Sequence, residues 1–228
     1  MNSGQINPAV PYKPLSAEGV PGSLPVAGRR QRRAEETRIR LFRSALELIA
    51  ERGLAHVTVE DITEAADVGK GTFFNYFATK DHVLGVMAEI QVAKVKEAAS
   101  RAAIGDRPIH DVLHRMVQRL AEEPGRSPSL ARAFISSFLA SESVRSIIKA
   151  TMLEGRATVA GVIAAGQERG EIDRSLVPEM AATHLMQSCL GTVVFWSLHE
   201  LPSLADCLEA TFQHFWRSVA VSGKEQAS

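Results

Sequence analysis

The sequence has few of the residues from which disulfide or zinc frameworks are built. Cys189 and Cys207 are the only cysteines in 228 residues, and they lack CxxC spacing. A disulfide scaffold or a thiolate zinc site is therefore not expected, and a reducing compartment is the simplest inference. No apolar run reaches the roughly 20 residues that cross a bilayer, and no apolar signal-peptide core is found near residue 1. We expect a cytoplasmic protein without a membrane partner.

Signatures of common enzyme classes are also missing. The chain contains no P-loop, no HExxH motif and no Rossmann glycine fingerprint, so we expect no catalytic residues and no cofactor. His110 and His114 stand four residues apart on one expected helix, but no third metal ligand can be placed beside them, and we expect no bound metal. Basic and acidic residues number 26 each, so any attraction to nucleic acid must come from uneven charge distribution.

Helical periodicity is what the chain has instead. Apolar residues recur at three- and four-residue spacing from residue 39 onward, and no convincing alternating strand pattern is found. This pattern predicts an all-α fold. Residues 1–28 differ, because they are rich in proline and glycine and show no sustained period. We expect these residues to form a disordered tail.

A basic cluster marks the start of the expected folded region. It consists of Arg29, Arg30, Arg32 and Arg33. Two interpretations are open: a solvated, charged lead-in to a helix, or an arm whose guanidinium groups bind the phosphates of a nucleic acid. The residues that follow favour the second.

These following residues predict a helix-turn-helix. An apolar face that includes Phe42 and Ile49 predicts a first helix, which Gly53 should end. Thr-Val-Glu-Asp at 58–61 has the capping-box pattern that begins a second helix. A tight turn at 67–69 then leads to a third, short helix at 70–77, of a size that fits the major groove of B-DNA.

The same stretch carries a family resemblance. Residues 37–84, TRIRLFRSALELIAERGLAHVTVEDITEAADVGKGTFFNYFATKDHVL, resemble the DNA-binding domain of the TetR family of bacterial regulators. The similarity lies in a helix ending Glu-Arg-Gly, a Thr-capped second helix, and Gly-Lys-Gly-Thr followed by aromatic residues and Lys80. It covers about a fifth of the chain. Phe74 departs from the pattern, since the family commonly has a tyrosine there.

The resemblance implies how the chain is organised and what it does. It implies a helix-turn-helix DNA-binding domain of three helices at 29–82 and a helical effector-binding and dimerisation domain at 83–228. The implied function is that of a homodimeric repressor, released from a near-palindromic operator in double-stranded DNA by a small, hydrophobic effector. The alternative is a protein-interaction adaptor of the same shape that does not bind DNA. The basic cluster and Lys70 argue against this alternative.

Candidate site residues follow from the cluster, from the resemblance and from the apolar pattern. Most DNA contacts are expected to position the protein on phosphates rather than read bases, with Phe73 and Phe77 in the core. The DNA-binding candidates are Arg29, Arg30, Arg32, Arg33, Thr58, Lys70, Gly71, Thr72, Phe74, Asn75, Tyr76 and Lys80. The ligand-binding candidates, each of which also suits a core position, are Met116, Phe134, Phe138, Met152 and His184. The dimer-interface candidates, from two unusually apolar helices, are Cys189, Val193, Trp196, Leu208, Phe212 and Phe215.

Overall fold

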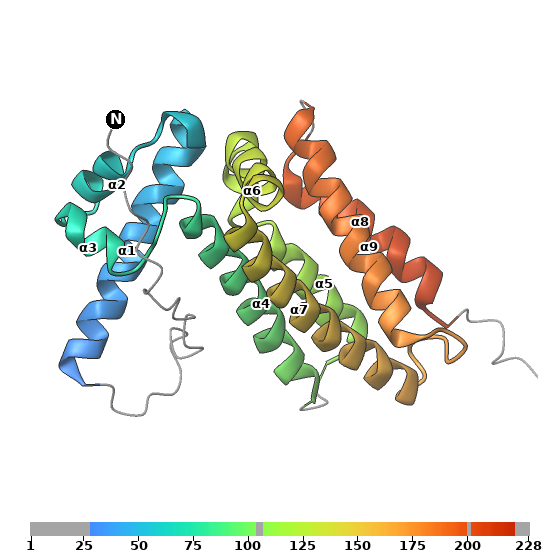
Figure 1. The fold of residues 1–228 in the computed structure, drawn as a ribbon. Helices are drawn as coiled ribbons and strands as arrows, with labels where there is room; N and C mark the ends of the chain where they lie inside the picture. The colour runs from blue at the N-terminus through green and yellow to red at the C-terminus, as the bar shows by residue number, and fades with distance from the viewer. Residues whose placement is uncertain (1–27, 104–106, 200–201, 222–228) are drawn as a thin grey trace, which may run out of the picture.

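The structure is a computed structural model that describes residues 28–103, 107–199 and 202–221 (Figure 1). In this part of the chain the predicted all-α fold is confirmed, since helices account for the regular structure apart from one isolated β-bridge between Ile172 and Ala220. The predicted tail lies outside the described residues except for Gly28. None of the described helices is both long enough and apolar enough to cross a membrane.

The N-terminal helices form a compact head. They are α1 (Arg29–Arg52), the 3-10 turn η2 (Leu54–His56), α2 (Val59–Ala65) and α3 (Lys70–Phe74). Gly53 ends α1 with a φ of 78°, and its N–H donates to the Ile49 carbonyl at 2.9 Å. The third helix is shorter than the predicted 70–77, because after Phe74 the backbone continues as a turn.

The remaining helices build a layered second region. They are α4 (His82–Ala103), α5 (Ile109–Leu120), η3 (Pro124–Arg126), α6 (Pro128–Ala140), α7 (Glu142–Glu168), α8 (Pro178–Leu198) and α9 (Leu204–Val219). Figure 1 shows α4, α5 and α7 as the central group, with α8 and α9 on the side away from the head. Serine side chains cap the start of three of these helices. Ser127 accepts from the Leu130 N–H at 3.1 Å, Ser141 from the Val144 N–H at 3.4 Å and Ser203 from the Asp206 N–H at 3.2 Å.

The head shares its apolar core with α4 and α6. The cluster around Leu46 and Ile62 also contains Val83 and Met87 of α4, and Leu130 of α6 completes it. Between α1 and the residue that caps α6, Ser127 Oγ donates to the Ala50 carbonyl at 3.2 Å. The boundary predicted at residue 82 therefore falls where one core continues from the head into the second region.

Candidate nucleic-acid interface and ligand cavity

A capping box fixes the start of α2. Thr58 Oγ1 accepts from the Asp61 N–H at 3.1 Å, and the Thr58 N–H donates to Asp61 Oδ2 at 2.8 Å, as the sequence predicted. The Thr58 hydroxyl also donates to Asp61 Oδ2, at 2.6 Å. Hydrogen bonds from Thr58 keep the pKa of the Asp61 carboxyl below its ordinary value, because they favour the charged form. A phosphate contact through the Thr58 hydroxyl would have to replace its bond to Asp61.

One side of α3 is core and the other faces solvent. Phe73 and Phe77 are 0% and 1% exposed, which confirms their predicted place in the core. Phe74 is 40% exposed and meets the ring of Phe73 edge-on at 5.5 Å between centroids. Asn75 is exposed and Thr72 half-buried. The predicted recognition segment thus presents an aromatic and polar surface to solvent.

Gly71 and Tyr76 carry features that the chain does not use internally. A Cβ on Gly71 would meet no atom within 4 Å, so packing inside the protein does not require a glycine there. The Tyr76 side chain packs partly against the core, while its hydroxyl has no hydrogen-bond partner among the described residues. Both positions leave room for an outside partner to approach.

Lys70, at the start of α3, is paired with α2. Its ammonium group contacts the Glu60 carboxylate, and both side chains are more than half exposed. The hydrogen bond from Lys70 is the main reason why the pKa of Glu60 lies below its ordinary value. Because the pair is exposed, its net contribution to stability is small. Lys70 can therefore exchange the carboxylate for a phosphate at little cost.

Lys80 ties the loop before α2 to the segment before α4. Its Nζ donates to the carbonyls of Leu54 and Val57 at 2.7 and 2.8 Å. The sequence suggested a contact with the DNA backbone, and no internal role was foreseen. Two of its three N–H groups are engaged within the chain, which leaves one for a phosphate.

The basic cluster lies on the first turns of α1. Arg30, Arg32 and Arg33 are exposed, whereas the side chain of Arg29 lies outside the described part of the chain. The nearby Arg38 behaves differently: it is 6% exposed and faces Glu89 of α4 at 3.6 Å. Burial lowers the pKa of Arg38 below its ordinary value. Arg38 is thus a structural cation that joins α1 to α4.

An almost entirely apolar cavity of about 170 Å³ lies within the second region. On the scale of engineered apolar cavities, a space of about 150 Å³ stays dry and binds benzene. Its walls come from α4, the turn after α5, and helices α6 to α9. The lining residues are Met87, Ala88, Gln91, Val92, Val95, Leu120, Pro124, Phe134, Ile148, Thr151, Met152, Gly155, Val159, Met186, Cys189, Leu190, Val193 and Leu208.

The predicted ligand residues fall in different places. Phe134 and Met152 line the cavity, whereas Met116, Phe138 and His184 are not among its lining residues. Met116 is 3% exposed in the core, Phe138 packs on a smaller cluster with Val144, and His184 faces outward beside α9. Gln91 was not among the predicted ligand residues, although its place between Met87 and Val95 on one face of α4 indicates that it points toward the same space.

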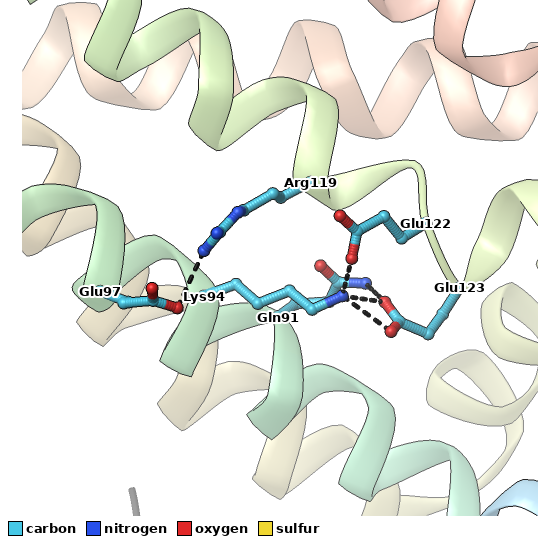
Figure 2. A network of polar contacts seen from close by, with 6 residues as sticks. All are labelled: Gln91, Lys94, Glu97, Arg119, Glu122 and Glu123. Atoms are coloured by element: carbon cyan, nitrogen blue, oxygen red, sulfur yellow. Dashed lines mark hydrogen bonds and ion pairs between the residues drawn. The ribbon is translucent and has the colours of Figure 1, made fainter. Parts of the chain in front are cut away.

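Gln91 belongs to a polar network beside the cavity (Figure 2). Its Nε2 donates to Glu123 Oε2 at 2.7 Å, and Lys94 Nζ lies 2.7 Å from Glu123 Oε1 and also contacts Glu122. Arg119 of α5 and Glu97 of α4 form a further ion pair at 2.9 Å. Gln91 Oε1 is buried and has no hydrogen-bond partner among the residues that the structure describes. The amide orientation follows from Glu123, since a flip would set the amide oxygen against a carboxylate.

The dimer candidates on α8 and α9 are mostly buried within their own chain. Leu208 and Phe212 are 0% exposed, and Cys189, Trp196 and Phe215 are at most 8% exposed. Val193 is half-buried and lines the cavity. Leu208 and Phe212, which have no exposed surface, lie in the core of their own chain. Phe215 also lines a groove on the outward side of the two helices, and the dimer interface on α8 and α9 stays a prediction.

Between α8 and α9, the outward side of the two helices holds a shallow groove whose lining is mostly small or polar. Thr192 Oγ1 and Thr211 Oγ1 lie 2.7 Å apart within it. Its other lining residues are His184, Ser188, Ala210, His214, Phe215 and Ser218.

His110 and His114 have partners other than a metal. Their rings stack at 5.9 Å between centroids, and His114 contacts Glu209 of α9. The His110 ring also meets Trp216 edge-on at 5.0 Å. Within the described ranges no group of three or more metal-ligating side chains is found.

Comparison with known proteins gives consistent matches. Residues 41–87 match the family model described as bacterial regulatory proteins, tetR family. The HTH-type transcriptional regulator TcmR of Streptomyces glaucescens is 35% identical over 47% of this chain, which spans only 56% of TcmR. The HTH-type transcriptional regulator EthR of Mycobacterium tuberculosis is 26% identical over 85% of this chain and 92% of its own.

A solved structure matches most of the length of the chain. It is FadR of Thermus thermophilus, a TetR-family transcriptional repressor determined in complex with lauroyl-CoA. The TM-score is 0.61 at 25% identity, and the match covers 84% of this chain and 99% of FadR.

Proposed function

We propose that the chain, which belongs to the TetR family of bacterial transcriptional regulators, is a homodimeric repressor. A small, hydrophobic molecule would release it from its operator. The observation that carries this proposal is that two helices contribute both to the cavity and to the core of the DNA-binding head. α4 and α6 line the cavity through Gln91 and Phe134, and the same two helices complete the core of the DNA-binding head through Met87 and Leu130. A molecule that moves these helices also moves the head.

The exposed side of the helix-turn-helix supports the DNA-binding part of the proposal. Phe74 and Asn75 are exposed and Thr72 is half-buried, and we assign all three to base edges or sugars in a major groove. Tyr76 and the arginines at the start of α1 supply groups for the phosphates on either side. We assign these residues to the operator contact, and Lys70 joins them once DNA replaces Glu60.

The cavity supports the ligand part. Gln91, Thr151 and Cys189 are the hydrogen-bonding side chains among lining residues that are otherwise apolar, and the related FadR was solved with a ligand that carries a long acyl chain. An unpaired, buried acceptor costs about 1–3 kcal/mol, so a ligand that also carries an N–H or O–H within reach of Gln91 Oε1 would bind more tightly than one held by apolar contacts alone. Release from DNA then requires that the ligand bind better to the arrangement of heads that does not fit the operator.

A second copy of the chain completes the proposed regulator. Two heads related by a two-fold axis would read half-sites about 34–36 Å apart, or a multiple of that distance. We assign the interface to the outward face of α8 and α9, where Ser188, Ala210 and His214 line the shallow groove.

The test begins with selection of DNA fragments from a random pool by the purified full chain. We expect an enriched inverted repeat, and failure to enrich any sequence would remove the regulator proposal. Release of the selected duplex is then followed on adding N-phenyl-1-naphthylamine, an apolar fluorescent probe with one N–H donor. The probe should bind and weaken the DNA complex.

A cavity-filling variant separates the two parts of the proposal. Thr151→Phe adds a ring to the cavity wall and should keep DNA binding while abolishing the response to the probe. Ala157→Phe, which adds the same ring to an exposed site on α7, is the matched control. Undiminished probe binding by Thr151→Phe would show that the ligand lies elsewhere.

A further inference from the structure

The apolar cavity shares a wall with a groove on the outer surface between α7 and α8. This groove has a volume of about 320 Å³, and Met152, Met186 and Leu190 line both spaces. Two of these three side chains are methionines, which are unbranched and rotate easily about three bonds. Small rotations of the methionines would therefore join the cavity to the groove.

The groove is positively charged. Lys149 and Arg156 of α7 line it seven residues apart, on one face of the helix, and no acidic residue contributes to its lining. Both are exposed, and neither has a hydrogen-bond or ion-pair partner among the described residues. The lysines of α4 contrast with them, since Lys94 pairs with Glu123 and Lys96 with Glu154. Two unpaired cations thus stand at the outer end of an apolar cavity.

We propose that the effector is an anionic amphiphile, with an aliphatic chain in the cavity and a carboxylate or phosphate head group bound by Lys149 and Arg156. This inference rests on the proposed function, because it concerns the ligand of the same cavity. The chain would pass between Met152 and Met186. Arg156 can hold either head group through two parallel hydrogen bonds, and Lys149 adds a second positive charge.

The test compares two ligands that differ only in the charge of the head group. Decanoate and methyl decanoate are titrated calorimetrically into the full chain and into the double variant Lys149→Ala/Arg156→Ala. We expect the full chain to prefer decanoate, and the double variant to bind decanoate about tenfold more weakly while its affinity for the ester is unchanged. Added salt should weaken decanoate binding in the full chain only. Arg115→Ala, which removes an exposed arginine of α5, should change neither affinity.

Opposite results would overturn the inference about the head group and leave the proposed ligand-binding role of the cavity unaffected. Equal affinity of the full chain for acid and ester, or decanoate binding that survives in the double variant, would show that the head group is not recognised at this groove. Continued binding of N-phenyl-1-naphthylamine would then leave the proposed function standing, and loss of all three ligands would remove both. Decyl phosphate bound in place of decanoate would support the inference and identify the head group as a phosphate.

Discussion

Single residues on the proposed DNA-facing side differ in how far the fold itself uses them. Thr58 and Lys80 are engaged within the chain through Asp61 and through two backbone carbonyls. Gly71 and the hydroxyl of Tyr76 are not. Substitution of Thr58 or Lys80 should therefore change both the stability of the protein and its affinity for DNA. Substitution of Gly71 or Tyr76 should lower the affinity for DNA without lowering the stability.

Tyr76→Phe removes the hydroxyl and keeps the ring that packs on the core. Because the hydroxyl has no partner among the described residues, the melting temperature should not change. Operator affinity should fall about tenfold or more, as expected when one hydrogen bond to a charged phosphate is lost. Fluorescence anisotropy with labelled operator measures the affinity, and an undiminished value would remove Tyr76 from the interface.

Gly71→Ala tests whether the bare start of α3 is needed for close approach to DNA. A methyl group there meets nothing within 4 Å, and alanine is favoured over glycine in a helix by up to about 1 kcal/mol. The variant should therefore be slightly more stable to urea and yet bind operator more weakly. A more stable protein with full DNA affinity would contradict the proposed groove contact.

At the scale of elements, internal clamps set the position of the head. Lys80 lies in the segment before α4. Its ammonium group donates hydrogen bonds to the carbonyls of Leu54 and Val57, in the turn between α1 and α2. Arg38 and Glu89 join α1 to α4 directly, with side chains only 7% and 11% exposed. These contacts make the orientation of the helix-turn-helix depend on α4, which is the helix that also lines the cavity.

Lys80→Met removes the ammonium group and retains most of the apolar stem. Since two backbone carbonyls lose a charged donor, the free energy of unfolding should fall by about 1–3 kcal/mol. Urea denaturation measures this change, with Lys96→Met as the control for an exposed lysine of α4. Unchanged stability combined with a smaller salt dependence of DNA binding would instead make Lys80 chiefly a phosphate contact.

Helices and their caps were largely predictable because their signals are local. The capping box at Thr58, the proline that begins α6 and the serine cap of α9 each depend on residues three or four apart. Burial of Arg38, the Lys80 clamp and the cavity residue Gln91 depend on contacts between segments far apart in sequence. Periodicity identifies an apolar face but not which neighbour covers it. Leu208 and Phe212, which the apolar pattern suggested for a dimer interface, are covered by their own chain.

At the scale of the whole molecule, the cavity lies between the head and the proposed dimer face. α4 and α6 join it to the head, while α8 and α9 contribute Leu190 and Leu208 to its far wall. A ligand that enlarges the cavity therefore pushes the head relative to α8 and α9. If these two helices are fixed against a second copy, that movement changes the spacing of the two recognition helices.

Ser188→Arg tests the proposed dimer face on α8. The long, charged side chain would enter the shallow groove shared with Ala210 and His214, where two copies related by a two-fold axis would bring two like charges together. Light scattering should show a dimer for the full chain and a monomer for the variant. Operator affinity should fall by about two orders of magnitude or more, because the two heads no longer bind as one linked pair. Ala157→Arg, on an exposed part of α7, should remain dimeric, and a dimeric Ser188→Arg variant would place the interface on another face.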